Sequence, residues 1–353
     1  MASWAESKDS LKGSNIEFVS IPDGLGPEED RSDLALLCPA LLNTMPGLLE
    51  KLIEDISVDG TRRISCIVAD LFIGWALEVA KKLGIIGAFL YTASAAMFAS
   101  QYYIPRMIDD GIIDCNGTPI QKGTFQLAPN MPIMHTDEIW WSNIGDLETE
   151  KKVFHYIKGF LQILNSTKWC LCNSTYELEP GPLSSLPKLL PIGPFLESSH
   201  CTRSLGQFWE EDLSCLNWLD QQLPCSVIYV AFGSFTVFNP HQFKELALGL
   251  KLVNRPFLWV VRSDVNKYTK CEYPHEFQGN LGKIVGWAPQ KQVLSHPATA
   301  CFISHCGWNS TVEGLCNGVP FLCWPYFCDQ FFDKRYICDE WKVGLGFDLM
   351  MKI

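Results

Sequence analysis

The sequence has no excess of positive charge. Its 28 Lys and Arg residues are outnumbered by 39 Asp and Glu residues, which leaves a formal net charge of −11. This balance argues against nucleic acid or an anionic membrane as the main partner, because both attract basic surfaces. It does not exclude an anionic nucleotide, because a few hydrogen-bond donors in a local cleft decide that kind of binding.

Metal-ligand and disulfide patterns are also missing, although the chain has 15 cysteines. Several of these cysteines lie in apolar runs, as buried thiols do. The first residues, MASWAESKDS, contain no apolar core and do not form a secretory signal. We therefore expect reduced thiols, a cytoplasmic location, no metal and no cofactor.

No membrane span is expected, and no internal repeat or low-complexity tract is present. The stretch 83–105 has no charged residue and reaches spanning length, but glycines and polar side chains interrupt it. A strand followed by a buried helix explains it better. With 47% hydrophobic residues and 12 Trp, the 353 residues can fill two globular cores, and we expect a monomer.

Strand and helix patterns alternate in both halves of the chain, which predicts an α/β fold with parallel sheets. In the first half we predict strands at Asn15–Ile21, Ile64–Ala69, Ile85–Tyr91 and Lys168–Ser174, and helices at Leu34–Ile56 and Gly74–Leu83. In the second half we predict strands at Ser226–Ala231, Phe257–Arg262, Ala300–Ser304 and Val319–Trp324, and helices at Pro240–Leu252 and Thr311–Asn317.

The most informative stretch runs from residue 287 to residue 330 and contains two successive strand-to-helix turns. In the first of these turns, 305–310, the start of a helix presents backbone N–H groups and a positive dipole end, which can hold a diphosphate. His305, Asn309 and Ser310 can add side-chain donors there. Ser234, at a glycine turn after another strand, is either a further phosphate contact or an ordinary turn residue.

Other residues of this stretch suit the rest of a nucleotide sugar. Trp287 offers a flat face for a base, and Glu313 can accept from ribose hydroxyls. Asp329 and Gln330 lie beyond the carboxyl end of a strand, where open α/β sheets bind ligands, and can bond to a hexose.

Each of these residues also has a purely structural interpretation. The residues from Ser310 to Glu313 read as S-x-x-E, the pattern of a helix capping box. Trp287 can belong to a core, and His305 can be a structural residue after a strand. The joint arrangement, and no residue alone, favours a ligand site.

This arrangement resembles the signature box of plant UDP-dependent glycosyltransferases, with W-A-P-Q at its start, H-C-G-W-N-S in its middle and D-Q at its end. The resemblance implies a GT-B fold, in which two Rossmann-like domains with parallel sheets face a cleft, and a UDP-sugar donor. It places uracil on Trp287 and the Ala288 backbone, and ribose on Gln290 and Glu313. It assigns the remaining contacts as follows: the diphosphate to Ser234, His305, the Trp308 backbone, Asn309 and Ser310, and the sugar to Asp329 and Gln330.

The resemblance further implies inverting transfer of a hexose, with Gln330 favouring glucose, to a hydroxyl of a small apolar acceptor such as a flavonoid or phenolic. UDP-glucose and that acceptor are the expected partners. On the acceptor side, candidates for pocket residues are Phe72, Trp75, Thr92, Met97, Trp140 and Trp141. Plain core packing explains each of them equally well.

The family's general base is a histidine in a glycine-rich turn after the first strand, oriented by an acidic residue. Asp70, which follows the strand Ile64–Ala69, matches the acid, although a helix N-cap explains it too. Thr92 matches a threonine that touches the donor sugar. None of the seven histidines lies in a G-x-H turn near the N-terminus.

We therefore expect an acceptor-side domain at 1–180 that begins after the family's first β-α-β unit, and an interdomain linker region at 181–225. A UDP-sugar-binding domain follows at 226–353, with an incomplete C-terminal end. The alternative function is a catalytically impaired nucleotide-sugar-binding or regulatory protein. An NAD-type oxidoreductase is disfavoured, because no G-x-G-x-x-G follows an early strand.

Overall fold

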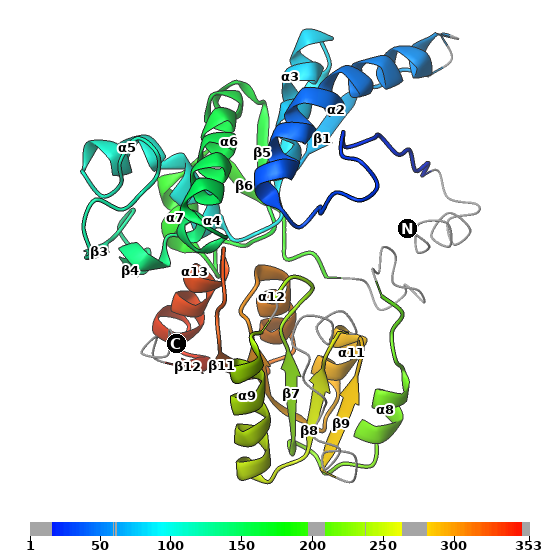
Figure 1. The fold of residues 1–353 in the computed structure, drawn as a ribbon, viewed down its shortest axis with the longest axis vertical. Coiled ribbons are helices and arrows are strands. Elements are labelled where there is room, and N and C mark those ends of the chain that lie inside the picture. Colours follow the sequence, from blue (N-terminus) through cyan, green and yellow to red (C-terminus); the bar gives the residue numbers. More distant parts are fainter. Residues whose placement is uncertain are drawn as a thin grey trace. The chain divides into compact units, whose positions relative to one another are not determined.

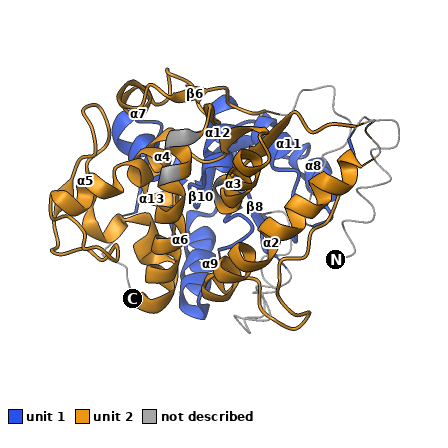
Figure 2. Ribbon diagram, turned by 90° about the horizontal axis from the view of Figure 1, so that it is seen from above, with its two compact units in different colours: residues 1–16, 197–326, 333–353 blue, residues 17–196, 327–332 orange. Residues whose placement is uncertain are grey.

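The computed structural model describes residues 16–196, 209–262 and 281–347, apart from the single residues 59, 61 and 237. They form two compact units (Figures 1 and 2). The N-terminal unit consists of residues 17–196 and 327–332, and the described part of the C-terminal unit consists of residues 16, 209–326 and 333–347.

The N-terminal unit alternates helices with short strands. Its helices are α2 (Leu34–Ser57), η1 (Leu71–Ile73), α3 (Trp75–Lys82), α4 (Ala95–Tyr102), α5 (Ile104–Asp109), η2 (Thr136–Glu138), η3 (Trp140–Asn143), α6 (Leu147–Ser166) and α7 (Pro180–Ser185). Its strands are β1 (Cys66–Ala69), β2 (Ile86–Tyr91), β3 (Thr124–Phe125), β4 (Met134–His135), β5 (Trp169–Cys172) and β6 (Leu189–Pro191).

Four of these strands form a parallel sheet in the order β1-β2-β5-β6. The strand predicted at Asn15–Ile21 is wrong: residues 16–21 have no regular secondary structure, and Asn15 lies outside the described residues. Residues 16–20 are exposed, whereas a strand in a covered parallel sheet is buried on both faces.

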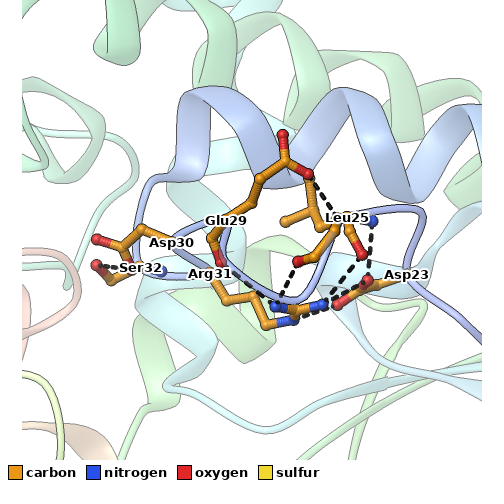
Figure 3. A network of polar contacts seen from close by, with 7 residues as sticks. Asp23, Leu25, Glu29, Asp30, Arg31 and Ser32 are labelled. Atoms are coloured by element: carbon orange, nitrogen blue, oxygen red, sulfur yellow. Dashed lines mark hydrogen bonds and ion pairs between the residues drawn. The ribbon is translucent and has the colours of Figure 1, made fainter.

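An arginine organises the acidic loop that follows (Figure 3). The guanidinium of Arg31 donates to both carboxylate oxygens of Asp23, at 2.7 and 3.1 Å, and to the carbonyl of Leu25 at 3.3 Å. The loop leads into α2, where the Asp33 side chain accepts from two amides of the first turn. This cap explains why the helix begins at Leu34, as the sequence predicts.

In the described part of the chain, α2 alone is long and apolar enough to cross a membrane, judged by length and composition only. It holds Pro39 and Pro46 and packs against α3 and α6. One such helix is weak evidence for a span, because core helices can have the same composition. The uncharged stretch 83–105 contains β2, α4 and the start of α5, as the strand-then-helix interpretation predicts.

The C-terminal unit contains a larger parallel sheet, and residues 330–335 form a helix that spans the boundary at Asp333. The helices are α8 (Ser214–Leu219), α9 (Pro240–Val253), α11 (Gln290–Ser295), α12 (Trp308–Cys316), α13 (Gln330–Arg335) and η5 (Tyr336–Glu340). The strands are β7 (Val227–Ala231), β8 (Phe257–Val260), β9 (Gly282–Val285), β10 (Thr299–Ser304), β11 (Phe321–Cys323) and β12 (Gly344–Gly346).

The stretch predicted as a linker, 181–225, contains regular structure of both units. Within it, α7 and β6 belong to the N-terminal unit, where β6 pairs with β5, and α8 belongs to the C-terminal unit. The predicted linker region therefore carries short elements of both units, and its role as a linker stays a prediction. This stretch is rich in proline and leucine, and that composition does not distinguish the short edge strand β6 from a connecting segment.

The six strands of the C-terminal sheet are ordered β12-β11-β10-β7-β8-β9. Val227 and Tyr229 of β7 pack on one face with residues of α8 and α11, whereas Val230 packs on the other face with residues of α9. Both faces are covered, which explains the continuous apolar runs of these strands. Parallel pairing also gathers the carboxyl ends of β7, β8, β9 and β10 at one edge.

A buried carboxylate in the N-terminal unit caps α4. Glu179 is fully buried, and its oxygens accept from the amides of Ala95 and Ala96, both at 2.8 Å, and from the Ser174 hydroxyl at 2.5 Å. Burial raises the pKa of Glu179 from 4.5 to about 7, and these hydrogen bonds oppose the shift. The fold therefore favours the protonated form of this residue more than the unfolded chain does.

This shift predicts a stability change with pH that Glu179→Gln removes. Because the folded pKa is raised, the contribution is complete below pH 4.5 and is lost as the pH rises towards 7. Urea unfolding from pH 5 to 8 should show the parent losing stability relative to the variant, by at most about 1.4 kcal/mol per pH unit. Glu177→Gln, at an exposed position, is the control and should follow the parent. A constant difference between parent and Glu179→Gln would contradict this assignment.

Candidate functional site

The turn between β10 and α12 places the start of a helix at the carboxyl edge of the C-terminal sheet. α12 begins at Trp308, three residues before the predicted start, and its N-cap is Gly307. A glycine has no side chain to cap the N–H groups of the first turn, so they keep their capacity to bind an anion. The alternative capping-box interpretation of Ser310 does not hold, because Ser310 lies inside the helix.

The Ser310 hydroxyl belongs instead to a network around Gln290. The Gln290 amide nitrogen donates to Ser310 Oγ at 2.9 Å and to Glu313 Oε2 at 2.8 Å. Its amide oxygen accepts from the Tyr229 hydroxyl at 3.2 Å. Burial raises the pKa of Tyr229, so this phenol stays protonated and donates. The network joins β7, α11 and α12 and holds the Glu313 carboxylate in one direction.

Tyr229 was missed by sequence reasoning. It occupies a position of β7 that looks like any other core residue, and its side chain is buried with the apolar cluster beside α11. Only its hydroxyl reaches a polar partner, on a helix 61 residues further along the chain. A tyrosine among aliphatic strand residues was the one available signal, since a buried phenol needs a hydrogen-bond partner.

The ring of His305 is enclosed by two glycines. A β-carbon on Gly233 or on Gly307 would lie 2.6 Å from His305 Nε2. Burial lowers the pKa of His305 to about 4, and the charge of Arg262 also lowers it, whereas a hydrogen bond in which the Ala231 backbone carbonyl accepts from the ring opposes the shift. The imidazole is therefore neutral at pH 7, and it can offer an N–H donor and a lone pair but no positive charge.

Trp287 lies against a second tryptophan. Its ring centroid is 4.8 Å from that of Trp209, with 30° between the planes, and its carbonyl accepts from the Asp212 amide at 2.9 Å. The Arg262 guanidinium lies 5.6 Å from the Trp209 centroid. Sequence reasoning missed Trp209 and Arg262, because neither lies in the box or near it in sequence.

The remaining predicted donor residues differ in exposure. Asn309 is exposed, Ser234 is half-buried, and Ala288 is 5% exposed. Trp308 is buried beside Trp341, so only its backbone is available to a ligand, as the resemblance implies. Ser234 follows Gly233, whose φ of +69° turns the chain at the end of β7.

Asp329 and Gln330 belong to the segment 327–332, which clusters with the N-terminal unit. Gln330 is 3% exposed and opens α13, and its side-chain oxygen accepts from the Phe327 amide at 3.0 Å. This contact gives Gln330 a structural task at the start of the helix, whatever else its amide group binds.

On the acceptor side, Asp70 caps a short helix. Its Oδ1 accepts from the amides of Phe72 and Ile73 at 3.0 and 3.3 Å, which is the helix-cap interpretation. Within the described ranges, no histidine is a hydrogen-bond partner of Asp70. The role of Asp70 in orienting a base therefore stays a prediction.

The acceptor candidates separate by burial. Thr92 is exposed and Phe72 is 38% exposed. The others are core residues, exposed by 4% or less, and pack inside the N-terminal unit: Trp75, Met97, Trp140 and Trp141. Over the described ranges, no three His, Cys, Asp or Glu side chains gather as a metal site would require.

Comparison with known sequences decides the family. Residues 198–351 match the family described as UDP-glucoronosyl and UDP-glucosyl transferase. UDP-glycosyltransferase 83A1 of Arabidopsis thaliana is 46% identical over 345 residues, which cover 95% of this chain and 72% of that protein. This chain belongs to the plant UDP-glycosyltransferases. A further relative is 7-deoxyloganetic acid glucosyltransferase of Catharanthus roseus, which is 34% identical. The aligned region covers 94% of this chain and 73% of that protein.

Solved plant UDP-glycosyltransferases share the fold. A UDP-glucosyltransferase from Polygonum tinctorium, capable of glucosylating indoxyl, superimposes with a TM-score of 0.79 and 28% identity, over 97% of this chain and 76% of its own. Phytolacca americana UGT2, complexed with UDP-2-fluoro-glucose and pterostilbene, superimposes with a TM-score of 0.73 and 25% identity. The superposition covers 98% of this chain and 76% of that protein. The fold class is therefore α/β of the GT-B type, and the chain is a glycosyltransferase of a family that uses nucleotide-sugar donors and small acceptors.

Gly233→Ala should lower the affinity of this UDP-glycosyltransferase for UDP, because the new β-carbon must displace the His305 ring. Gly318→Ala is a matched control: its φ of +67° is equally left-handed, but open space surrounds it. The left-handed backbone should cost each variant about 1–2 kcal/mol of stability, and the clash with His305 should cost Gly233→Ala more than this. Calorimetric titration with UDP should show a loss of affinity only for Gly233→Ala, and equal affinities of the two variants would contradict the placement of His305.

Proposed function

We propose that this chain transfers glucose from UDP-glucose to a hydroxyl of a small apolar acceptor, such as a flavonoid or another phenolic. The observation that carries the proposal is the Gln290 network beside the uncapped start of α12. The names of relatives favour glucose, since they include glucosyltransferases. A stilbene, pterostilbene, is the acceptor-like molecule bound in Phytolacca americana UGT2.

The donor would lie across the carboxyl edge of the C-terminal sheet. Trp287 would stack on uracil while the Ala288 backbone bonds to the edge of the base, and Gln290 and Glu313 would hold the ribose diol. A carboxylate held 2.8 Å from an amide nitrogen keeps a fixed direction, which suits recognition of two adjacent hydroxyls.

The diphosphate would meet the first turn of α12, with Asn309, Ser310 and the neutral His305 as side-chain donors, and Ser234 at the end of β7. Negative charge on the diphosphate grows as it leaves, so these fixed donors would bind the transition state more strongly than the ground state. Asp329 and Gln330 would hold the hydroxyls of the sugar.

The reaction itself would be a direct displacement. The acceptor oxygen forms a bond to the anomeric carbon as the bond from that carbon to the UDP oxygen breaks, with inversion at carbon. The acceptor proton passes to a general base, which the family resemblance describes as a histidine oriented by Asp70. Thr92 and Phe72, which reach the surface of the N-terminal unit, would contact sugar or acceptor.

Turnover and binding should be measured together. The protein would be given UDP-glucose or UDP-galactose with a panel of flavonoids, other phenolics and aliphatic alcohols, and UDP release and glycoside mass recorded. Glucoside formation with a phenolic supports the proposal. UDP binding without any glycoside would favour the nucleotide-sugar-binding alternative, and absence of UDP binding would contradict both.

Removal of the stacking face with Trp287→Ala should weaken UDP binding by about 1–3 kcal/mol, since base–aromatic stacking has that magnitude. Trp287→Phe is the matched variant, because it keeps a smaller aromatic face and should lose less. Calorimetric titration checks both. If Trp287→Ala binds UDP as tightly as the parent, Trp287 is a core residue and not the base platform.

Gln330 can be tested for its two tasks separately. Gln330→Glu keeps an oxygen that accepts from the Phe327 amide but removes the donor hydrogens that a sugar hydroxyl would use. Both Gln330→Glu and Gln330→Ala should reduce the advantage of UDP-glucose over UDP and leave UDP affinity nearly unchanged. If Gln330→Ala lowers the affinity equally for UDP and UDP-glucose, and Gln330→Glu lowers neither affinity, Gln330 is a structural residue of α13.

A further inference from the structure

One guanidinium links the two halves of the candidate donor site. Arg262, at the carboxyl end of β8, is 5% exposed. Its Nη1 donates to the Gly233 carbonyl at 2.8 Å, and its Cζ lies 5.6 Å from the centre of the Trp209 ring. The first contact reaches the turn that precedes Ser234, and the second reaches the ring that lies against Trp287.

We propose that Trp209 and Arg262 are positioning residues for the UDP donor: Trp209 supports the ring on which the base stacks, and Arg262 ties this support to the phosphate turn. The inference rests on the proposed function, because it assumes that Trp287 meets uracil and that Ser234 meets phosphate. It adds two residues that lie outside the signature box.

The support of Trp287 follows from its surroundings. Its side chain is half-buried, so it needs a neighbour to hold one ring orientation. Trp209 provides a ring at 4.8 Å, and the hydrogen bond from the Asp212 amide to the Trp287 carbonyl fixes the two backbones beside each other. One face of Trp287 then rests on Trp209, and the proposal assigns the base to the opposite face.

Arg262 acts on the phosphate side through a peptide plane. The Gly233 carbonyl and the Ser234 N–H belong to one planar trans peptide, so they point in opposite directions. The hydrogen bond from Arg262 fixes the carbonyl and thereby directs the Ser234 N–H away from the guanidinium. A planar guanidinium can stack on an aromatic ring while its fork of N–H groups donates, which an ammonium cannot reproduce.

The experiment compares uridine with UDP in calorimetric titrations. Trp209→Ala should weaken uridine and UDP by a similar factor of about 3–10, because only the base half loses its support. Trp209→Phe should recover part of the loss. Arg262→Lys should weaken UDP by a larger factor than uridine, since it disturbs the phosphate turn as well. Tyr176→Ala, at an exposed site of the N-terminal unit, should change neither affinity.

A double variant separates positioning from general destabilisation. In a Trp287→Ala background the Trp209 ring has no base platform to support, so adding Trp209→Ala should cause no further loss of uridine affinity. A full additional loss would mean that Trp209 acts on the fold, and the inference would be wrong. Trp209→Leu, which keeps apolar volume without an aromatic face, replaces Trp209→Ala if the latter does not fold.

The remaining outcomes are equally decisive. Unchanged UDP affinity of Trp209→Ala overturns the inference, and so does a tighter affinity, which would mean that the Trp209 ring stands where the base binds. Equal losses of uridine and UDP in Arg262→Lys overturn the phosphate arm. If the parent itself does not bind UDP, the proposed function fails, and this inference fails with it.

Discussion

The close approach of the His305 ring to two backbone positions without a β-carbon is the constraint on which the donor half of this molecule depends. Gly233 lies in the turn after β7 and Gly307 is the N-cap of α12, and a methyl group at either would lie 2.6 Å from the ring. The strand, the turn and the helix can therefore meet around one imidazole. Because β7 and β10 are paired in parallel, this contact sets where the first turn of α12 lies along the sheet edge.

The same burial decides the electrostatics. His305 is held neutral, so the candidate phosphate site relies on oriented donors and a helix end in place of a histidine charge. Arg262 is buried, and it donates a hydrogen bond to the Gly233 carbonyl. This bond orients the peptide of the turn before Ser234. A chain with a net charge of −11 can accommodate an anionic nucleotide in this way, because fixed dipoles act locally whereas the overall charge acts at long range.

The two units handle their polar buried groups in a similar manner. In the N-terminal unit a fully buried Glu179 is held by two amides at the start of α4 and by a serine hydroxyl. In the C-terminal unit the side chain of Gln290, on α11, forms three hydrogen bonds, which join this helix to β7 and α12. The first network ties the start of α4 to the segment after β5, and the second ties α11 and α12 to β7. The aromatic pair Trp140–Trp141, in contrast, contributes apolar packing, which is why it offers little surface to an acceptor.

The sequence by itself determined the α/β class, most strands and the signature box, because alternating apolar runs and a contiguous motif are local properties. It gave the strand Ile85–Tyr91 to within one residue and placed Gln290, Ser310 and Glu313 in one site. Local patterns misread the exposed segment 16–21 and the capping box at Ser310, since a strand needs partners and a helix start depends on its turn. Only the tertiary structure brought in Tyr229, Trp209 and Arg262. Their partners lie on other elements, far along the chain, and strand order and burial decide which side chains meet.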